Sequence, residues 1–239
     1  FMQAAIDGKP FVQQYPIDAD EPLFKKEISA TDLWKKIVHN AWKSAEPGVL
    51  FWDTILRESV PDCYADLGYR TVSTNPCGEI PLCPYDSCRL LAINLYSYVV
   101  NPFKPDAYFD FDLFKKHVAL AQRIMDDIID LELEKIERIM AKIDSDPENE
   151  DVKHTESVLW QKIYKKSGQG RRTGVGITAE GDMLAALGLR YGTEEATEFA
   201  EKVHQTVALS AYRSSVEMAK ERGAFEVYDS EREKNNPFI

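Results

Sequence analysis

The sequence has no long apolar run, few cysteines and no excess of positive charge, and each shortage excludes a class of protein. No apolar stretch approaches the ~20 residues that cross a bilayer, so no membrane partner is expected. The net charge of −11 argues against a general nucleic-acid surface, although it allows a local anion site for a nucleotide. Four cysteines in 239 residues are too few for a secreted disulfide scaffold, and no secretory signal pattern is seen. A reduced, cytoplasmic setting is therefore expected.

What is present is the composition of a globular protein. The 239 residues suffice for one sizeable core, and 44% of them are hydrophobic and 29% charged. Strand-like and helix-like segments alternate, which predicts the α/β class. The first residues are already in a helical pattern without an initiator Met, and the last five, 235–239, end at an apolar residue without a helix cap. We therefore expect residues 1–239 to be an internal piece of a larger protein.

The order of elements follows from periodicity and from the residues that start and stop helices. Helices are predicted at residues 1–7, 29–46, 110–143, 152–166, 181–187 and 193–222. Strands are predicted at residues 49–52, 89–100 and 172–178. The proline-containing segment 9–28 is predicted as a loop, and residues 57–73 as irregular. Acidic residues between 126 and 138 are typical of a solvated helix face.

The sequence TNPCGE, residues 74–79 and called here the fingertip, carries the strongest chemical signal. In an extended segment, Asn75, Cys77 and Glu79 would project from one face, with Pro76 and Gly78 on the other. An amide can hold a hydroxyl, a carboxylate can take its proton, and a thiol can carry a radical or act as a nucleophile. The alternative is a turn at a strand end with a buried cysteine and two exposed polar residues, and local composition alone favours that alternative.

The other cysteines and the histidines do not form a metal site by spacing. Cys77, Cys83 and Cys88 are spaced C-x5-C-x4-C, whereas zinc sites usually show closer pairs with a second pair beyond. The four histidines are scattered, so no metal is expected. Cys63 and Cys83 are interpreted as structural thiols.

Glycines cluster between residues 168 and 181 and suggest a nucleotide loop. Their spacing matches neither the dinucleotide-binding pattern nor the P-loop. The pattern favours glycines packed around a buried strand. No serine lies in a G-x-S-x-G elbow either.

Several motifs together resemble the ribonucleotide reductase catalytic subunit. They are NPCGEIPL at residues 75–82, DSC at 86–88, LAINL at 91–95, PGVLFWD at 47–53 and RRTGVG at 171–176. They come in the family's order and cover nearly the whole chain. The Pro-Cys-Gly wording of the fingertip resembles the adenosylcobalamin-dependent class, class II.

The resemblance implies a fold and a set of roles. Residues 1–239 would be part of a ten-stranded α/β barrel with the fingertip at its centre, and the enzyme would reduce ribonucleotides, ribonucleoside diphosphates in particular, for DNA synthesis. Cys77 would carry the thiyl radical, Glu79 would act as the base, and Asn75 would hold a ribose hydroxyl, with Pro76 and Gly78 completing the substrate-binding loop. Cys88 would be one of two cysteines oxidised to a disulfide, its partner lying outside this chain.

The resemblance also implies partners. Adenosylcobalamin is the expected cofactor, and a thioredoxin-type protein the expected reductant of the full enzyme. Nucleotide effectors would bind outside this chain, a homodimer is expected, and the fragment alone would be inactive. Two alternatives stay open. One is another thiyl or glycyl-radical-type barrel enzyme, which would use Cys77 without needing Cys88. The other is a non-catalytic piece of a split reductase.

Overall fold

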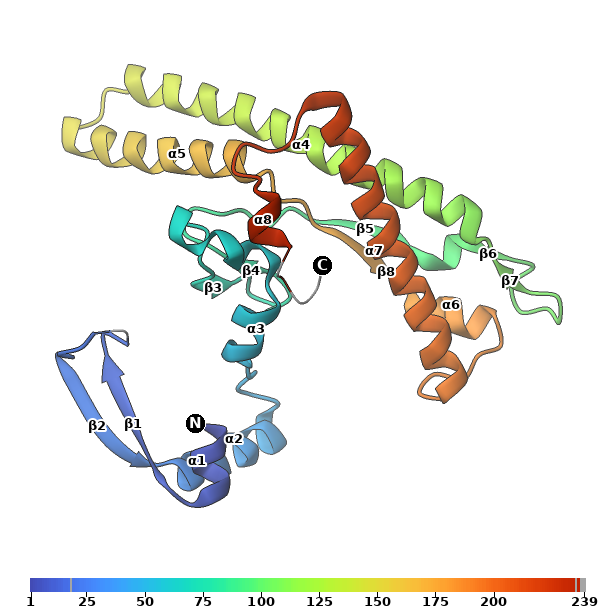
Figure 1. Ribbon diagram of the computed structural model, residues 1–239, viewed down its shortest axis with the longest axis horizontal. Coiled ribbons are helices and arrows are strands. Elements are labelled where there is room, and N and C mark those ends of the chain that lie inside the picture. Colours follow the sequence, from blue (N-terminus) through green and yellow to red (C-terminus); the bar gives the residue numbers. More distant parts are fainter. Residues whose placement is uncertain (18, 235, 237–239) are drawn as a thin grey trace. The chain divides into compact units, whose positions relative to one another are not determined.

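The computed structural model describes residues 1–17, 19–234 and 236, so most of the C-terminal end discussed above lies outside the described residues (Figure 1). The chain divides into two compact units, residues 1–54 and 55–239. Helices and strands are mixed along both, which fits the α/β class. The strands of the described residues pair as four two-stranded sheets, and a closed barrel is not visible among them.

The first unit holds a β-hairpin between two helices. Helix α1 (Met2–Asp7) ends at Gly8, strands β1 (Pro10–Tyr15) and β2 (Phe24–Ser29) pair antiparallel, and α2 (Ala30–Ser44) follows. The prediction of a loop over residues 9–28 is therefore wrong. Pro10 occupies the first position of β1, where a missing N–H is tolerated, and the other prolines fall between the strands.

The predicted start of the second helix is confirmed. The Ser29 side chain caps α2 by accepting a hydrogen bond from the backbone N–H of Asp32 at 3.2 Å. The predicted buried strand at residues 49–52 is wrong, because residues 49–51 are exposed and helix α3 (Trp52–Glu58) begins at Trp52. A four-residue apolar run does not distinguish a strand from the start of a helix.

The second unit is built on a parallel pair of strands, β5 (Leu91–Asn94) and β8 (Val175–Thr178). Helix α4 (Phe111–Ser145) contacts both strands, and α7 (Glu194–Arg222) packs against α4 (Figure 1). Helix α6 (Glu180–Ala186) contacts the 3-10 turn η2 (Leu95–Tyr98). The core contains the fully buried side chains of Leu95, Phe114, Val118, Met183 and Val203.

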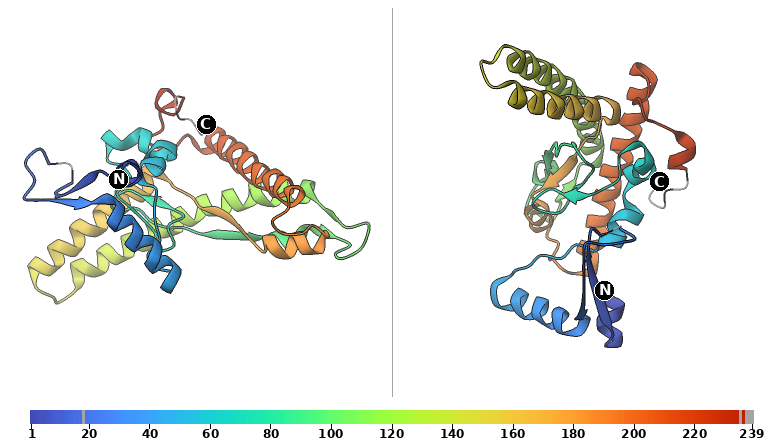
Figure 2. Two further views of the ribbon diagram at one scale, coloured as in Figure 1. Left: turned by 90° about the horizontal axis from the view of Figure 1, so that it is seen from below. Right: turned by 90° about the vertical axis from the view of Figure 1, so that its left-hand side faces the viewer.

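Helices α4 and α5 (Glu150–Gly170) form an antiparallel hairpin that extends beyond the strands (Figure 2). Both are longer than predicted, and the side chains of Asp110 and Asn149 cap their N-termini. The last long helix is capped by Thr193 and ends at Gly223, as predicted. The caps Asp110 and Thr193 made α4 and α7 predictable, whereas α5 begins two residues before its predicted start at residue 152.

Short elements complete the unit. The predicted strand 89–100 is divided, since η2 separates β5 from β6 (Val99–Val100), which pairs with β7 (Tyr108–Phe109). The segment before the fingertip contains a 3-10 helix, η1 (Val60–Leu67), and α8 (Ser230–Glu233) contacts it. Among the described residues, none of the helices combines the length and the hydrophobicity of a membrane span.

Candidate active site

The fingertip closes a short antiparallel hairpin. Strands β3 (Ser73–Thr74) and β4 (Pro81–Leu82) pair in the register Ser73 with Leu82 and Thr74 with Pro81. The Val72 N–H extends this pairing by donating to the Leu82 carbonyl at 2.9 Å. The loop between the strands therefore starts and ends at fixed backbone positions.

The loop itself is a turn. The Gly78 N–H donates to the Asn75 carbonyl at 3.0 Å, and Gly78 has a φ of +85°, in the left-handed region that favours glycine. The prediction that Asn75, Cys77 and Glu79 share one face of an extended segment is therefore wrong. Asn first, Pro second and Gly fourth are the preferences of a type I turn, a signal that the sequence already contained.

Asn75 holds the loop closed with its side chain. It is buried, and its Oδ1 accepts a hydrogen bond from the Ile80 N–H at 2.9 Å, while its own N–H donates to the Ile80 carbonyl at 3.2 Å. The side chain thus replaces the backbone carbonyl that is engaged with Gly78. Among the described residues, no hydrogen bond from Asn75 Nδ2 is found, so this amide group has donors to offer a ligand.

Cys77 and Glu79 lie at the exposed end of this turn. Both side chains are exposed, and Cys77 is a free thiol. The alternative reading of a strand-end turn is therefore right about the backbone but wrong about a buried cysteine. An exposed thiol and carboxylate next to a fixed amide are accessible to a small ligand.

Cys88 is also a free, exposed thiol, three residues before β5. The prediction that it lies near the start of that strand is confirmed. Its neighbour Arg89 is buried and contacts three groups: Ser167 Oγ at 2.8 Å, the Arg172 carbonyl at 2.8 Å, and the Glu132 carboxylate. That Cys88 faces the same cavity as Cys77 stays a prediction.

Cys83 and Cys63 have different surroundings. Cys83 is buried beside Tyr64 and Tyr69, and its thiol donates to Asp86 Oδ2 at 3.5 Å. Burial, with the Asp86 carboxylate adding to it, raises the pKa of Cys83 to about 11. Burial also raises the pKa of Cys63. Both are therefore held as neutral thiols, which favours the structural interpretation.

A protein-family model described as "Ribonucleotide reductase, barrel domain" matches residues 3–238 of this chain. The chain belongs to that family. The family resemblance predicted from the fingertip and its flanking motifs is thereby confirmed.

Individual relatives of this barrel-domain chain are longer proteins. A Thermoplasma acidophilum protein named "Vitamin B12-dependent ribonucleoside-diphosphate reductase" is 36% identical over 210 residues, covering 87% of this chain and 23% of the relative. A Mycobacterium tuberculosis protein of the same name is 31% identical over 206 residues, covering 86% and 25%. The variola virus "Ribonucleoside-diphosphate reductase large subunit" is 26% identical over 221 residues, covering 92% and 25%. The chain spans about a quarter of the length of these relatives.

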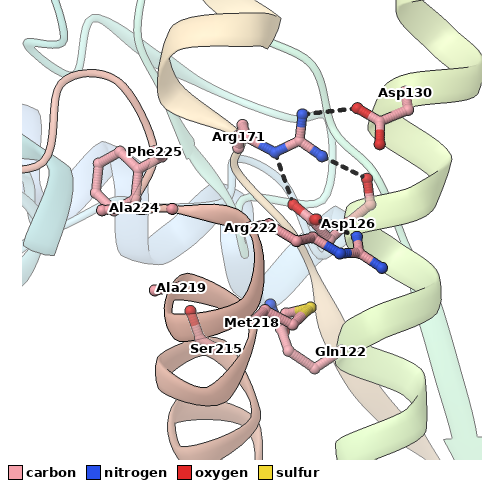
Figure 3. A pocket seen from close by; sticks show the side chains of 11 residues that line it. Gln122, Asp126, Asp130, Arg171, Ser215, Met218, Ala219, Arg222, Ala224 and Phe225 are labelled. Atoms are coloured by element: carbon pink, nitrogen blue, oxygen red, sulfur yellow. Dashed lines mark hydrogen bonds and ion pairs between the residues drawn. The ribbon is translucent and has the colours of Figure 1, made fainter.

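This barrel-domain chain also has an ion-pair network that sequence reasoning missed. Arg171, at the end of α5, reaches Asp126 Oδ1 at 2.8 Å and Asp130 Oδ1 at 2.7 Å (Figure 3). Arg222 also pairs with Asp126, at 3.0 Å, and these residues line a pocket of about 250 Å³. The acidic stretch of α4 is therefore not only a solvated face, because Asp126 and Glu132 receive arginines from other segments.

The RRTG segment, residues 171–174, requires glycine at its last position. A Cβ on Gly174 would lie 2.2 Å from the carbonyl oxygen of Arg89, so only glycine fits where β8 meets the segment before β5. Gly170 is similarly close to the ring of Tyr69, at 2.8 Å. The Gly174 contact supports the interpretation of glycines packed around a strand, whereas Gly170 lies at the end of α5. No group of three or more potential metal ligands is found among the described residues.

Proposed function

We propose that the parent protein reduces ribonucleoside diphosphates to 2′-deoxyribonucleoside diphosphates for DNA synthesis, and that this chain supplies the fingertip part of its barrel. The observation that carries the proposal is the hairpin turn, which places an exposed thiol beside a fixed amide. The match of residues 3–238 to the reductase barrel domain supports it, as do the names of relatives that share 31–36% of their aligned residues with it.

The turn offers each part that the chemistry needs. A thiyl radical on Cys77 takes the 3′ hydrogen of the ribose, and the similar strengths of S–H and sugar C–H bonds let that hydrogen return later. Glu79 takes the proton of the 3′ hydroxyl. Asn75 donates from Nδ2 to a ribose hydroxyl and orients the sugar, since Oδ1 is already engaged with the hairpin. Pro76 and Gly78 set the turn that presents these groups.

Cys88 supplies electrons. The 2′ C–O bond breaks and its oxygen leaves as water, while a C–H bond forms in its place. Two thiols, that of Cys88 and that of a second cysteine elsewhere in the parent, are oxidised to one disulfide in the same turnover. A dithiol reductant of the thioredoxin type then restores both thiols.

Adenosylcobalamin is the proposed cofactor, because relatives that share the fingertip region carry names stating vitamin B12 dependence. When bound, it supplies the radical that starts the reaction. Cys77 fits a radical-based start, because its thiol is exposed and can give up a hydrogen atom to become the thiyl radical.

The remaining expectations concern the assembly. We propose that residues 1–239 form part of one ten-stranded barrel domain, in which β5 and β8 are two neighbouring strands. Nucleotide effectors bind in other parts of the parent, which works as a homodimer in the cytoplasm. The length of the relatives supports a barrel completed by further segments.

The test uses the full-length parent with adenosylcobalamin, a dithiol reductant and each ribonucleoside diphosphate. Formation of 2′-deoxyribonucleotide that depends on all three is the expected result. Residues 1–239 alone should form none, since the second redox cysteine is expected elsewhere. A full-length protein that binds the cofactor yet forms no deoxynucleotide from any diphosphate contradicts the proposal.

A further inference from the structure

We propose that Arg172 is a positioning residue that fixes Cys88 relative to the fingertip. The inference rests on the proposed function and adds to it a residue that touches neither the substrate nor the reacting sulfurs. It is carried by the contacts of the Arg172 side chain and carbonyl with the hairpin base, defined here as residues 81–89.

The guanidinium of Arg172 joins two points of the hairpin base. Nη2 donates to the Pro81 carbonyl at 2.8 Å, and Nη1 pairs with the Asp86 carboxylate. Pro81 follows Glu79, the proposed general base, by two positions, and Asp86 precedes Cys88 by two. One planar side chain therefore sets the spacing between the exit of the fingertip and the entry to Cys88.

Asp86 passes this constraint to the backbone. Its side chain is only 5% exposed, and Oδ1 accepts a hydrogen bond from the Ser87 N–H at 2.9 Å. Oδ2 accepts from the Cys83 thiol. The carboxylate is thus held from several sides, and the peptide that leads into Cys88 is held with it.

The backbone of Arg172 holds the other flank of Cys88. Its carbonyl accepts from Arg89 Nη1 at 2.8 Å, and the carbonyl of Gly174, two residues further on, accepts from the Leu91 N–H at 3.0 Å. Arg172 therefore contacts Asp86 before the exposed Cys88 thiol and Arg89 after it. Two thiols form a disulfide only within narrow Cα separations, and a displacement of about 1 Å in a reacting group can lower a rate about 10²-fold.

The adjacent arginine provides a matched control. Arg171 and Arg172 have similarly exposed side chains, 23% and 21%, and both form ion pairs. Arg171, however, pairs with Asp126 and Asp130 of α4 rather than with the hairpin base. Lysine at either position keeps the charge and loses the planar fork that joins two acceptors.

The experiment measures how turnover is partitioned in the full-length holoenzyme. A ribonucleoside diphosphate labelled at the 3′ hydrogen reports cleavage of that bond by label exchange, and deoxynucleotide yield reports reduction. Their ratio does not depend on how much enzyme is folded. Arg172→Lys should lower deoxynucleotide formed per 3′ cleavage at least about tenfold, within the range for a displaced group. Arg171→Lys should leave the ratio at the wild-type value.

Asp86→Asn removes the same ion pair without changing side-chain shape, and it decides the question if Arg172→Lys does not fold. A ratio lowered by Asp86→Asn but not by Arg171→Lys supports the proposal. An unchanged ratio in Arg172→Lys and Asp86→Asn, or an equal loss in Arg171→Lys, overturns it. A wild-type enzyme that forms no deoxynucleotide would instead refute the proposed function.

Discussion

The tip and the base of the hairpin differ in almost every physical respect. The tip is the fingertip of residues 74–79, where Cys77 and Glu79 are exposed on a turn that is fixed by Asn75. In the hairpin base, Cys83 and Arg89 are buried, and Arg89 is hydrogen-bonded to the Arg172 carbonyl, far along the chain. The difference indicates that the tip presents the reactive groups and that the hairpin base sets their positions. Variants of the two regions should therefore fail in different ways.

The largest effect is expected at Cys77. Cys77→Ser in the full-length enzyme should abolish deoxynucleotide formation and 3′ label exchange together, because an O–H bond is too strong to replace the thiol in hydrogen transfer. The side chain is exposed, so thermal unfolding should not change. Cys63→Ser is the control and should stay active. Substantial turnover by Cys77→Ser would show that the tip does not carry the radical.

The Glu79→Gln variant should show the next largest effect. It keeps the shape of the side chain and removes the base, and general acid–base contributions of about 10²–10⁴-fold set the expected loss in kcat. Glu217→Gln, an exposed carboxylate on α7, is the control. A loss below about threefold, far outside that range, would assign Glu79 a merely structural role.

Asn75 has two roles in the tip, one toward the ligand and one toward the turn, and two variants separate them. Asn75→Asp keeps an oxygen for the Ile80 N–H but loses the Nδ2 donors, so activity should fall while this hydrogen bond remains, and the buried carboxylate adds its own cost in stability. Asn75→Ala leaves that N–H without its acceptor and should also destabilise the hairpin by about 1–3 kcal/mol. Activity assays and denaturant unfolding check the two. An Asn75→Ala protein as stable as the wild type would show that the hydrogen bond does not hold the turn.

The smallest effect concerns the packing behind the hairpin base. Gly174→Ala should destabilise the full-length protein by about 1–3 kcal/mol, because the added methyl group meets the Arg89 carbonyl. Gly181→Ala, in α6, meets nothing within 4 Å and should be neutral or stabilising by up to about 1 kcal/mol. Thermal unfolding compares the pair. A Gly174→Ala protein as stable as Gly181→Ala would refute the close approach of β8 to residue 89.

Local sequence signals predicted the long helices, because each depends on neighbouring residues. Ser29, Asp110 and Thr193 each lie just before the helix that they cap. The turn was also encoded locally, in the order Asn, Pro and Gly, but the assumption of extended geometry led to a wrong face assignment. The proline at the start of β1 misled in the same way, since its position in the strand depends on pairing.

The contacts of the hairpin base could not be predicted from the sequence. Arg172 lies 86 positions from Asp86 and 91 from Pro81, and two adjacent arginines give no indication of which faces which partner. Only the folded arrangement of β8 and the hairpin shows that Arg172 contacts the hairpin base and that Arg171 contacts α4. The same holds for Glu132, which the pattern assigned to a solvated face and the fold assigns to Arg89.

The most direct test of the division between tip and base is the Cys88→Ser variant of the full-length enzyme, assayed with substrate labelled at the 3′ hydrogen. With Cys77 intact, label exchange should persist, while deoxynucleotide should fall below detection and damaged substrate or inactivated enzyme should accumulate. Deoxynucleotide formation at a near wild-type rate would contradict the account, because Cys88 would then supply no electrons. Loss of label exchange in this variant would contradict it equally, since Cys77 alone should start the reaction.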